Sequence, residues 1–170
     1  AKNNSIVALD AATGKEIWIH PPAPDTKVIT SRGINYWESR DRSERRLLFA
    51  SNHALRAIDA RTGKPIPSFG NSGSVDLKEG LDRDPKTIRL VQSTMPGRVF
   101  EDLLILGSAT NQGYGSAPGD IPAFDVRTGK LVWTSHTVPR PGEFGYDTWP
   151  KDAWKRVGGS NVWGEMSIDA

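Results

Sequence analysis

Arg32 and Gly33, in the stretch "SRGINYW" at residues 31–37, are well suited to bind a carboxylate. An arginine guanidinium offers a planar fork of N–H donors that pairs with both carboxylate oxygens, which a lysine ammonium does not reproduce. A neighbouring glycine lets the backbone pass close to a ligand, because it carries no side chain. The structural alternative is that Arg32 forms an ion pair with Glu38 or Asp41, which follow shortly in the sequence.

The other residue types restrict the chemistry that this sequence can perform. It contains no cysteine, which excludes disulfides, zinc–thiolate sites and thiol nucleophiles. His20, His53 and His136 show no metal-ligand spacing, so surface or turn positions are expected for them. Asn111 and Gln112 carry side-chain amide oxygens, which calcium accepts as ligands.

The composition is that of a globular domain, with 170 residues of which 36% are apolar and 25% charged. The 22 basic and 20 acidic residues are interspersed, so the net charge of +2 predicts neither nucleic-acid binding nor a polybasic membrane anchor. No apolar run approaches the roughly 18 residues of a membrane span, and other forms of membrane association stay open. The charged residues at 78–86 are expected to form a solvated loop face.

An internal repeat defines the elements that must position these side chains. The pattern A-x-D-x-x-T-G-K begins the segments at residues 8–18, 57–67 and 123–133. Each copy follows an apolar run of β type, turns through Asp, Thr and Gly, and enters a second short apolar run, which predicts a hairpin. In such a turn the aspartate accepts backbone N–H bonds, the threonine adds a hydroxyl and the glycine adopts the left-handed conformation.

The last residue of the repeat is expected to join neighbouring units. Trp18 and Trp133 end the first and third copies, and a large flat ring on the last strand of a unit can pack against the next unit. Pro67 stands at this position in the second copy. We expect that contact to be weakened, or remade by Phe69.

These features predict an all-β fold in a single domain covering residues 1–170. The repeated aspartates lie far enough apart for four short strands, and the 17 glycines and 12 prolines agree with many turns. We therefore expect a partial β-propeller of about three four-stranded blades with tryptophan-docking repeats. Closed propellers need at least four blades, so the chain is expected to be an internal segment of a longer protein.

The three turns resemble the tryptophan-docking repeats of the pyrroloquinoline quinone (PQQ) dehydrogenase superfamily, which also includes cofactor-free scaffolds. Three stretches narrow the resemblance. "SRGINYW" is similar to the family's Arg-Gly-x-x-Tyr segment, and "LLILGSATNQ" at residues 103–112 to its strand-end Gly-Ser segment. Residues 146–169 resemble its Trp-Pro-x-Asp-Ala-Trp run and its Gly-Gly-x-x-x-Trp segment. Their order agrees with the family along essentially the whole chain.

The resemblance implies an eight-bladed propeller and a PQQ pocket to which this chain contributes one wall. Arg32 would meet a cofactor carboxylate, and Trp163 would lie flat on the quinone. The full cofactor-binding set that it implies is Arg32, Gly33, Ser93, Thr94, Ser108, Asn161 and Trp163. The structural alternatives are core packing for Trp163 and ordinary strand-end positions for Ser108 and Thr110.

The resemblance also implies a calcium ion at Asn111 and Gln112. Alcohol-oxidising members are expected to carry Glu at the second of these positions and sugar-oxidising members Asp-Asn, so the neutral pair here lowers the negative charge of the site. The family's catalytic aspartate has no matching position before Ala170, and Asp169 lies too close to Trp163 for that role. No catalytic residue is therefore expected within this segment.

The activity implied is oxidation of a sugar or an alcohol, with hydride passing to the quinone, in the periplasm. A quinone or cytochrome would then accept the electrons. The absence of a vicinal cysteine pair before Arg32, and "FGNSGSVDL" at residues 69–77, favour a sugar; "TWPKDAW" favours an alcohol. The alternatives are a non-enzymatic propeller scaffold that binds other proteins and a sugar-binding lectin propeller.

Overall fold

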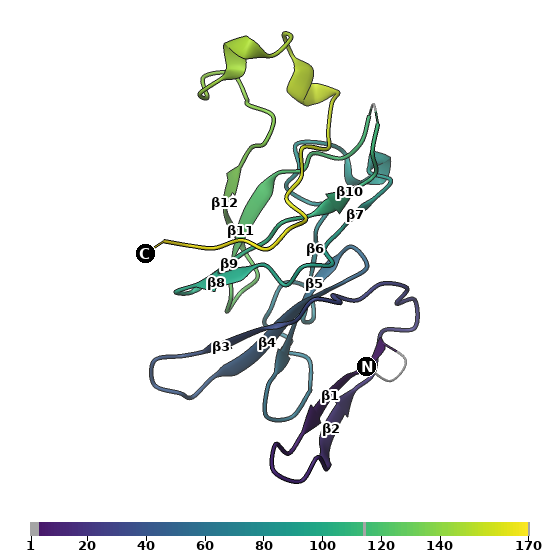
Figure 1. Cartoon of the computed structure of the whole chain (residues 1–170), viewed down its shortest axis with the longest axis vertical. Coiled ribbons are helices and arrows are strands. Elements are labelled where there is room, and N and C mark those ends of the chain that lie inside the picture. Colours follow the sequence, from purple (N-terminus) through teal and green to yellow (C-terminus); the bar gives the residue numbers. More distant parts are fainter. Residues whose placement is uncertain (1–3, 114, 170) are drawn as a thin grey trace.

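The computed structural model describes residues 4–113 and 115–169, which form antiparallel β-sheets joined by long loops. Figure 1 shows the sheets following one another along the long axis of the molecule, with the N-terminal hairpin at one end. The described residues contain no α-helix, and their 3₁₀ turns include η2 (Pro85–Thr87), η3 (Tyr146–Thr148) and η4 (Ala153–Lys155). None of the helices in this part of the chain is long and apolar enough to cross a membrane.

Four sheets contain all the strands of the described residues. The first is a hairpin of β1 (Ile6–Leu9) and β2 (Glu16–His20). The second has the order β3 (Asn35–Glu38), β4 (Arg45–Ser51), β5 (Ala54–Asp59) and β6 (Ser74–Asp76). The third has the order β8 (Arg98–Phe100), β9 (Leu103–Ile105), β11 (Ile121–Asp125) and β12 (Leu131–Ser135). A short pair joins β7 (Val91–Gln92) to β10 (Ala109–Thr110).

This arrangement confirms the predicted all-β, partial propeller architecture. Each of the three main sheets carries one repeat, whose turn follows β1, β5 or β11. Within the described residues, two of these sheets have four strands and the first has two, so the three repeats belong to two complete blades and one hairpin.

The three repeats fold into the same turn. In the first copy, Asp10 Oδ1 accepts hydrogen bonds from Thr13 N at 2.8 Å and Thr13 Oγ1 at 2.6 Å, and Gly14 N donates to Asp10 O at 2.8 Å. Equivalent bonds surround Asp59 and Asp125. The three turn glycines have φ values of 69°, 68° and 73°, in the left-handed region. The predicted roles of Asp, Thr and Gly are confirmed.

Trp18 joins the first sheet to the second by docking on the next turn. Its Nε1 donates to Ala60 O at 3.2 Å, and a Cβ at Gly63 would lie only 2.5 Å from Trp18 Cε3. His20 follows on the same strand, with Nδ1 2.8 Å from Gly63 O and its ring edge-on to Phe49. The ring of Trp18 therefore occupies the space that any side chain at Gly63 would need.

Phe69 makes the corresponding contact between the second and third sheets, where Pro67 replaces tryptophan. Phe69 is fully buried, and its Cζ would lie 3.1 Å from a Cβ at Gly129, the turn glycine of the third repeat. Gly70 N donates to Thr128 O in the same turn at 2.7 Å. The expectation that Phe69 remakes the contact is confirmed.

Trp37 adds a second contact between these two sheets. It is buried, its Nε1 donates to Asp102 Oδ1 at 3.1 Å, and the Arg127 guanidinium carbon lies 4.8 Å from its ring centroid. Arg127 Nη1 also donates to Asp102 Oδ2 at 2.8 Å. Buried Arg46 donates to Val126 O at 3.2 Å. Trp37, at the end of the Arg-Gly-x-x-Tyr stretch, thus has a structural role.

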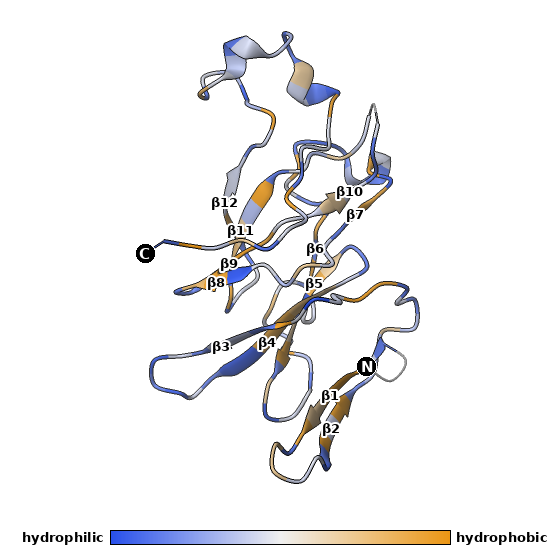
Figure 2. Cartoon of the chain, viewed as in Figure 1, coloured by the Kyte–Doolittle hydropathy of each residue, from blue (hydrophilic) through white to orange (hydrophobic). Residues whose placement is uncertain are grey.

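The hydrophobic core lies between the second and third sheets. Figure 2 shows the apolar residues concentrated in the strands, while most loops are polar. The largest core side chains that are fully buried include Leu48, Leu55, Phe69 and Leu104. On the outer strand β12, by contrast, Trp133 is 40% exposed, and no turn in the described residues covers it.

Alanine at Gly63 is expected to destabilise the protein more than alanine at Gly14. The two glycines have the same φ within 1°, so both variants carry a left-handed strain of about 1 kcal/mol. Only Gly63 faces Trp18, whereas nothing lies within 4 Å of a Cβ at Gly14. Overpacking should add about 1–3 kcal/mol at Gly63, measured as the free energy of unfolding in denaturant. Equal losses in the two variants would contradict the docking contact.

Thr13→Val is expected to raise the pKa of Asp10. Hydrogen bonds from the Thr13 hydroxyl and amide lower this pKa, so ionised Asp10 stabilises the fold above its ordinary pKa, and that stabilisation disappears as the pH falls through the folded-state value. Valine keeps the shape of threonine and removes the hydroxyl donor. NMR titration of the Asp10 carboxyl measures the shift. Thr26→Val, whose hydroxyl contacts Ser51, should leave the titration unchanged.

Candidate functional site

The segment that carries Arg32 and Gly33 is fixed against residues 93–96, although the two stretches are far apart in the sequence. Thr30 Oγ1 donates to Gly33 O at 3.0 Å and lies 3.2 Å from Thr94 O, which also accepts from Ser31 N at 3.2 Å. Gly33 has a φ of 128°, a conformation that L side chains rarely adopt. Hydrogen bonds therefore fix the loop both before and after Arg32.

Arg32 lies beside Trp163, which comes from the C-terminal end of the chain. The guanidinium carbon is 6.0 Å from the ring centroid, and Arg32 Nη1 is 3.3 Å from Met95 Sδ. Trp163 is 62% exposed, so core packing is the wrong interpretation of this tryptophan. The guanidinium thus lies over one face of the Trp163 ring, in a cation–π arrangement, and this exposed residue can offer the opposite face to a planar ligand.

The alternative ion pairs of Arg32 are not formed among the described residues. Glu38 instead pairs with Arg45, with 3.1 Å between Oε1 and Nε. Asp41 accepts hydrogen bonds from the Ser39 hydroxyl and from Ser43, which lower its pKa to about 2. Both carboxylates thus stabilise the turn between β3 and β4.

The chain reaches Trp163 by crossing the third sheet at very short range. A Cβ at Gly107 would lie 2.2 Å from Val162 O, and a Cβ at Gly158 would lie 2.1 Å from Ser116 O. Asn161 Nδ2 donates to Ser108 O at 2.7 Å. Figure 1 shows this segment, in yellow, returning from η4 past β10. The glycines permit the crossing because one residue of each contact, Gly107 or Gly158, has no side chain to collide with the other backbone.

Three polar atoms lie buried and without a hydrogen-bond partner in one short stretch of the described chain. They are Ser108 Oγ, Thr110 Oγ1 and Asn111 Oδ1. Unpartnered buried polar atoms are uncommon and call for a ligand, a water or another explanation. Ser108 directly precedes β10, Thr110 is its last residue and Asn111 directly follows it, so strand-end positions describe these residues and the missing partners are the feature to be explained.

The β7–β10 pair brings the two predicted hydroxyl segments together. Gln92 pairs with Ala109, so Ser93 follows one paired residue and Ser108 precedes the other. Ser93 is buried and its hydroxyl donates to Met95 O at 2.9 Å, which leaves it as an acceptor towards any ligand. Thr94 is half-buried and holds the Arg32 loop through its carbonyl.

The two predicted metal ligands lie in different environments. Asn111 Oδ1 is buried, whereas Gln112 is exposed. In residues 4–113 and 115–169, no group of three or more histidine, aspartate or glutamate side chains could hold a metal ion.

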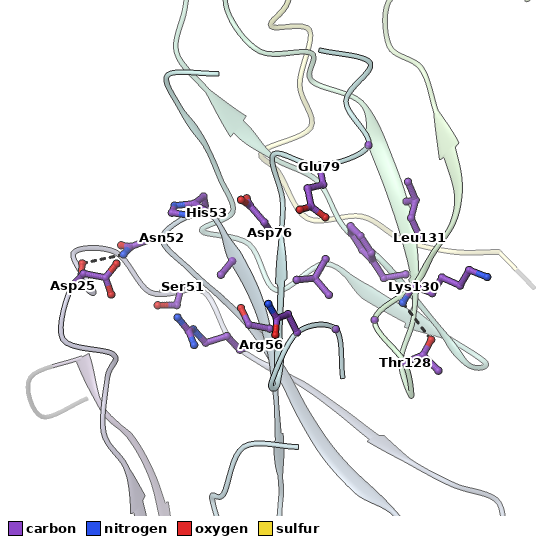
Figure 3. Close-up of a pocket in the computed structure, with 18 residues that line it drawn as sticks. Asp25, Ser51, Asn52, His53, Arg56, Asp76, Glu79, Thr128, Lys130 and Leu131 are labelled. Carbon is purple, nitrogen blue, oxygen red and sulfur yellow. Dashed lines mark hydrogen bonds between the residues drawn. The ribbon is translucent and has the colours of Figure 1, made fainter. Parts of the chain in front are cut away.

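A hollow of about 230 Å³ opens beside Arg32 and Gly33. Arg98 and Glu165 also line it, and Arg98 Nε donates to Met166 O at 2.7 Å. A larger hollow of about 730 Å³ lies elsewhere, beside β5 and β6 and the turn of the third repeat. Figure 3 shows its polar side chains, Arg56 among them, and none of the predicted site residues lines it.

Sequence reasoning missed two arginines that hold the C-terminal segments. Arg83 is half-buried and donates to three backbone carbonyls, so the expectation of a solvated face at residues 78–86 is wrong at this position. Arg140 and Asp120 form a buried ion pair at 3.0 Å, and the Arg140 guanidinium carbon lies 5.0 Å from the Trp154 ring centroid. Every residue has a backbone carbonyl, so the sequence does not show which carbonyls Arg83 bonds. Only the folded structure shows this role.

Residues 1–170 match the family model described as the PQQ glucose/ethanol/alcohol dehydrogenase β-propeller domain. The quinoprotein glucose dehydrogenase of Gluconobacter oxydans (strain 621H) is 30% identical over 169 residues, covering 87% of this chain and 21% of that protein. The quinohemoprotein alcohol dehydrogenase ADH IIB of Pseudomonas putida is 31% identical over 181 residues, covering 96% and 23%. The dehydrogenase subunit of the quinone-dependent alcohol dehydrogenase of Acetobacter aceti is 32% identical over 185 residues, covering 95% and 23%.

The chain thus spans between a fifth and a quarter of the length of these relatives. Among solved structures, BamB from Moraxella catarrhalis is similar with a TM-score of 0.40 and 19% identity, covering 79% of this chain and 46% of that chain.

Gly107→Ala is expected to displace the segment that carries Trp163, whereas Gly164→Ala is not. Neither glycine has a left-handed φ, but a Cβ at Gly107 would collide with Val162 O, and nothing lies within 4 Å of a Cβ at Gly164. Difference fluorescence between each variant and its Trp163→Phe counterpart isolates the emission of Trp163. Gly107→Ala should increase the quenching of this emission by acrylamide. Identical quenching in the two alanine variants would contradict the crossing.

Proposed function

Because the chain belongs to the PQQ glucose/ethanol/alcohol dehydrogenase β-propeller family, we propose that it forms one wall of the PQQ pocket in a quinoprotein dehydrogenase. The observation that carries this proposal is the placement of Arg32 beside the exposed ring of Trp163, 6.0 Å from guanidinium carbon to ring centroid. PQQ is a planar quinone with three carboxylates. Its pocket requires a fixed cation beside a flat apolar surface.

Arg32 and Trp163 would bind different parts of the cofactor. The guanidinium would pair with a carboxylate, and its only polar side-chain contact in the described residues is the weak acceptor Met95 Sδ. Trp163, a residue that is 62% exposed, would receive the face of the tricyclic quinone on the side of the ring that Arg32 does not cover. Gly33 would let the Arg32 backbone lie close to the ligand, because no side chain intervenes.

The buried polar atoms near β10 would bind the remaining oxygens of the cofactor. Ser108 Oγ can donate one hydrogen bond, and Thr110 Oγ1 can donate another. Thr94 would contribute its hydroxyl from the adjacent segment, and the Ser93 hydroxyl, which donates to Met95 O, would accept a hydrogen bond from the ligand. Asn161 would act through Ser108, whose carbonyl it holds at 2.7 Å.

The bound quinone would supply the hydride acceptor for oxidation of a hydroxyl group. The residues of this chain would bind the cofactor, orient its plane and exclude water from one of its faces. We assign no catalytic base within the chain. Its contribution to the rate would thus come from positioning.

Calcium, if it binds, would use Asn111 Oδ1, whose buried position suits a ligand that lacks another partner. Gln112 is exposed and would have to turn inward to join it. Two neutral amides bind a hard divalent ion weakly without carboxylates. We therefore propose that most of any calcium affinity comes from ligands other than this pair.

The substrate of the intact protein is proposed to be a sugar or an alcohol, in keeping with the glucose and alcohol dehydrogenases that this chain resembles. The electrons would pass to a quinone or a cytochrome. The proposal includes a periplasmic location. A non-enzymatic scaffold is the second candidate, because the docking contacts of Trp18 and Phe69 need no cofactor.

Titration of PQQ into the full-length protein, with and without calcium, tests the proposal. Wild-type protein is expected to show quenched tryptophan fluorescence. Arg32→Ala should weaken binding by about 10- to 100-fold, the range for a charged hydrogen-bonded pair, and Trp163→Ala by about 10-fold. Activity of the loaded protein towards aldoses and primary alcohols, with an artificial electron acceptor, then distinguishes the two substrate classes.

Two exposed residues provide matched controls. Arg89→Ala and Trp149→Ala remove the same side-chain types from positions outside the site and should leave the PQQ affinity unchanged. Absence of binding by the wild-type protein in both conditions would favour the scaffold. Binding that survives Arg32→Ala and Trp163→Ala would place the cofactor elsewhere.

A further inference from the structure

We propose that Arg83 is the positioning residue for Trp163, a role that rests on the proposed PQQ pocket. Arg83 lies in the charged stretch after β6, within the same loop as η2. It would not touch the cofactor. It would fix the start of the segment that carries the stacking ring.

The guanidinium of Arg83 joins two stretches of backbone that are far apart in the sequence. Nη1 donates to Ser116 O at 2.6 Å. Nη2 donates to Val157 O at 2.6 Å and to Trp154 O at 3.2 Å. Trp154 belongs to η4, and Val157 lies two residues beyond the end of η4. One side chain thus connects the loop before β11 to the end of η4.

The surroundings of Arg83 make these bonds strong. The side chain is half-buried, and burial is the main cause that lowers its pKa, although an arginine stays protonated at neutral pH. Charged donors form stronger hydrogen bonds than neutral ones, and three carbonyls would lose their bonds to a charged donor without it. Lysine carries a single ammonium and cannot reproduce the two-sided fork.

Close backbone contacts run from Arg83 to Trp163. Beyond Val157, Gly158 approaches Ser116 O, and Gly159 N donates to Ala117 O at 3.0 Å. Asn161 then bonds Ser108 O, and Val162 lies against Gly107. The segment has little freedom between these contacts, so a shift at Val157 would move the ring of Trp163 relative to Arg32.

The neighbouring ion pair of Arg140 and Asp120 stabilises a different segment. Arg140 bonds Asp120 at 3.0 Å and Val138 O at 2.8 Å, so it anchors the loop that enters η3. None of the hydrogen bonds of Arg140 reaches a residue beyond η4 in the described chain. Of Arg83 and Arg140, Arg83 is therefore the one that bonds the segment before Trp163, while Arg98 bonds Met166 O on the far side of the ring.

Amide hydrogen exchange in the cofactor-free, full-length protein tests the positioning role. Arg83→Met keeps most of the side-chain volume and removes the donors. Exchange at residues 157–163 is expected to accelerate about 10-fold or more, the scale of one charged hydrogen bond, while exchange in β4 and β5 stays as in wild type. Arg83→Lys should restore it only in part. Arg89→Met, at an exposed position in the following loop, is the matched control and should change neither region.

PQQ titration of the same variants gives the second readout. Arg83→Met is expected to weaken PQQ binding by about 10-fold, although Arg32 and Trp163 are both present. Unchanged exchange at residues 157–163 would overturn the proposal, and so would accelerated exchange throughout the second and third sheets in both Arg83 variants. Failure of the wild-type protein to bind PQQ would instead overturn the proposed function, and the exchange data would still decide whether Arg83 holds the segment.

Discussion

An aromatic ring against a glycine that has no room for a side chain is the contact on which the rest of this structure depends. Trp18 makes it on Gly63, and Phe69 together with Val75 makes it on Gly129. Each contact needs a turn whose glycine adopts a left-handed φ, and the aspartate and threonine of the second or third repeat stabilise that turn. Because packed interiors are hard to compress, these contacts limit how closely neighbouring sheets approach.

The geometry of the candidate site depends on this stacking of the sheets. Arg32 belongs to the loop that leads into the second sheet, whereas Ser108 and Trp163 belong to segments that pack on the third. Two sheets held at a fixed separation bring these residues together, and Trp37 with Asp102 reinforces the same interface. A ligand pocket at a junction between repeats needs no dedicated domain, because the repeats already supply rigid walls.

The parts of the structure that sequence reasoning predicted are those in which a residue type has one physical use. The turns were predictable because Asp, Thr and Gly at fixed spacing make a single kind of turn, and Phe69 because an aromatic ring was needed near Pro67. Arg83 was not predictable, since its acceptors are backbone carbonyls that any sequence possesses. The exposure of Trp163 was equally hidden, because a sequence does not distinguish a stacking tryptophan from a core one.

The buried polar atoms of the β10 stretch weigh against a purely structural interpretation of the site. A scaffold gains nothing from burying Ser108 Oγ, Thr110 Oγ1 and Asn111 Oδ1 without partners, since each such group costs about 1–3 kcal/mol. Alanine or valine would fill the same space at no such cost. The segment that leads to Trp163 contacts the same stretch, since Asn161 donates to Ser108 O, so a ligand or ordered water there could satisfy these groups. A ligand that formed hydrogen bonds with these atoms would offset the cost of burying them. The pocket would therefore favour a ligand rich in oxygen atoms.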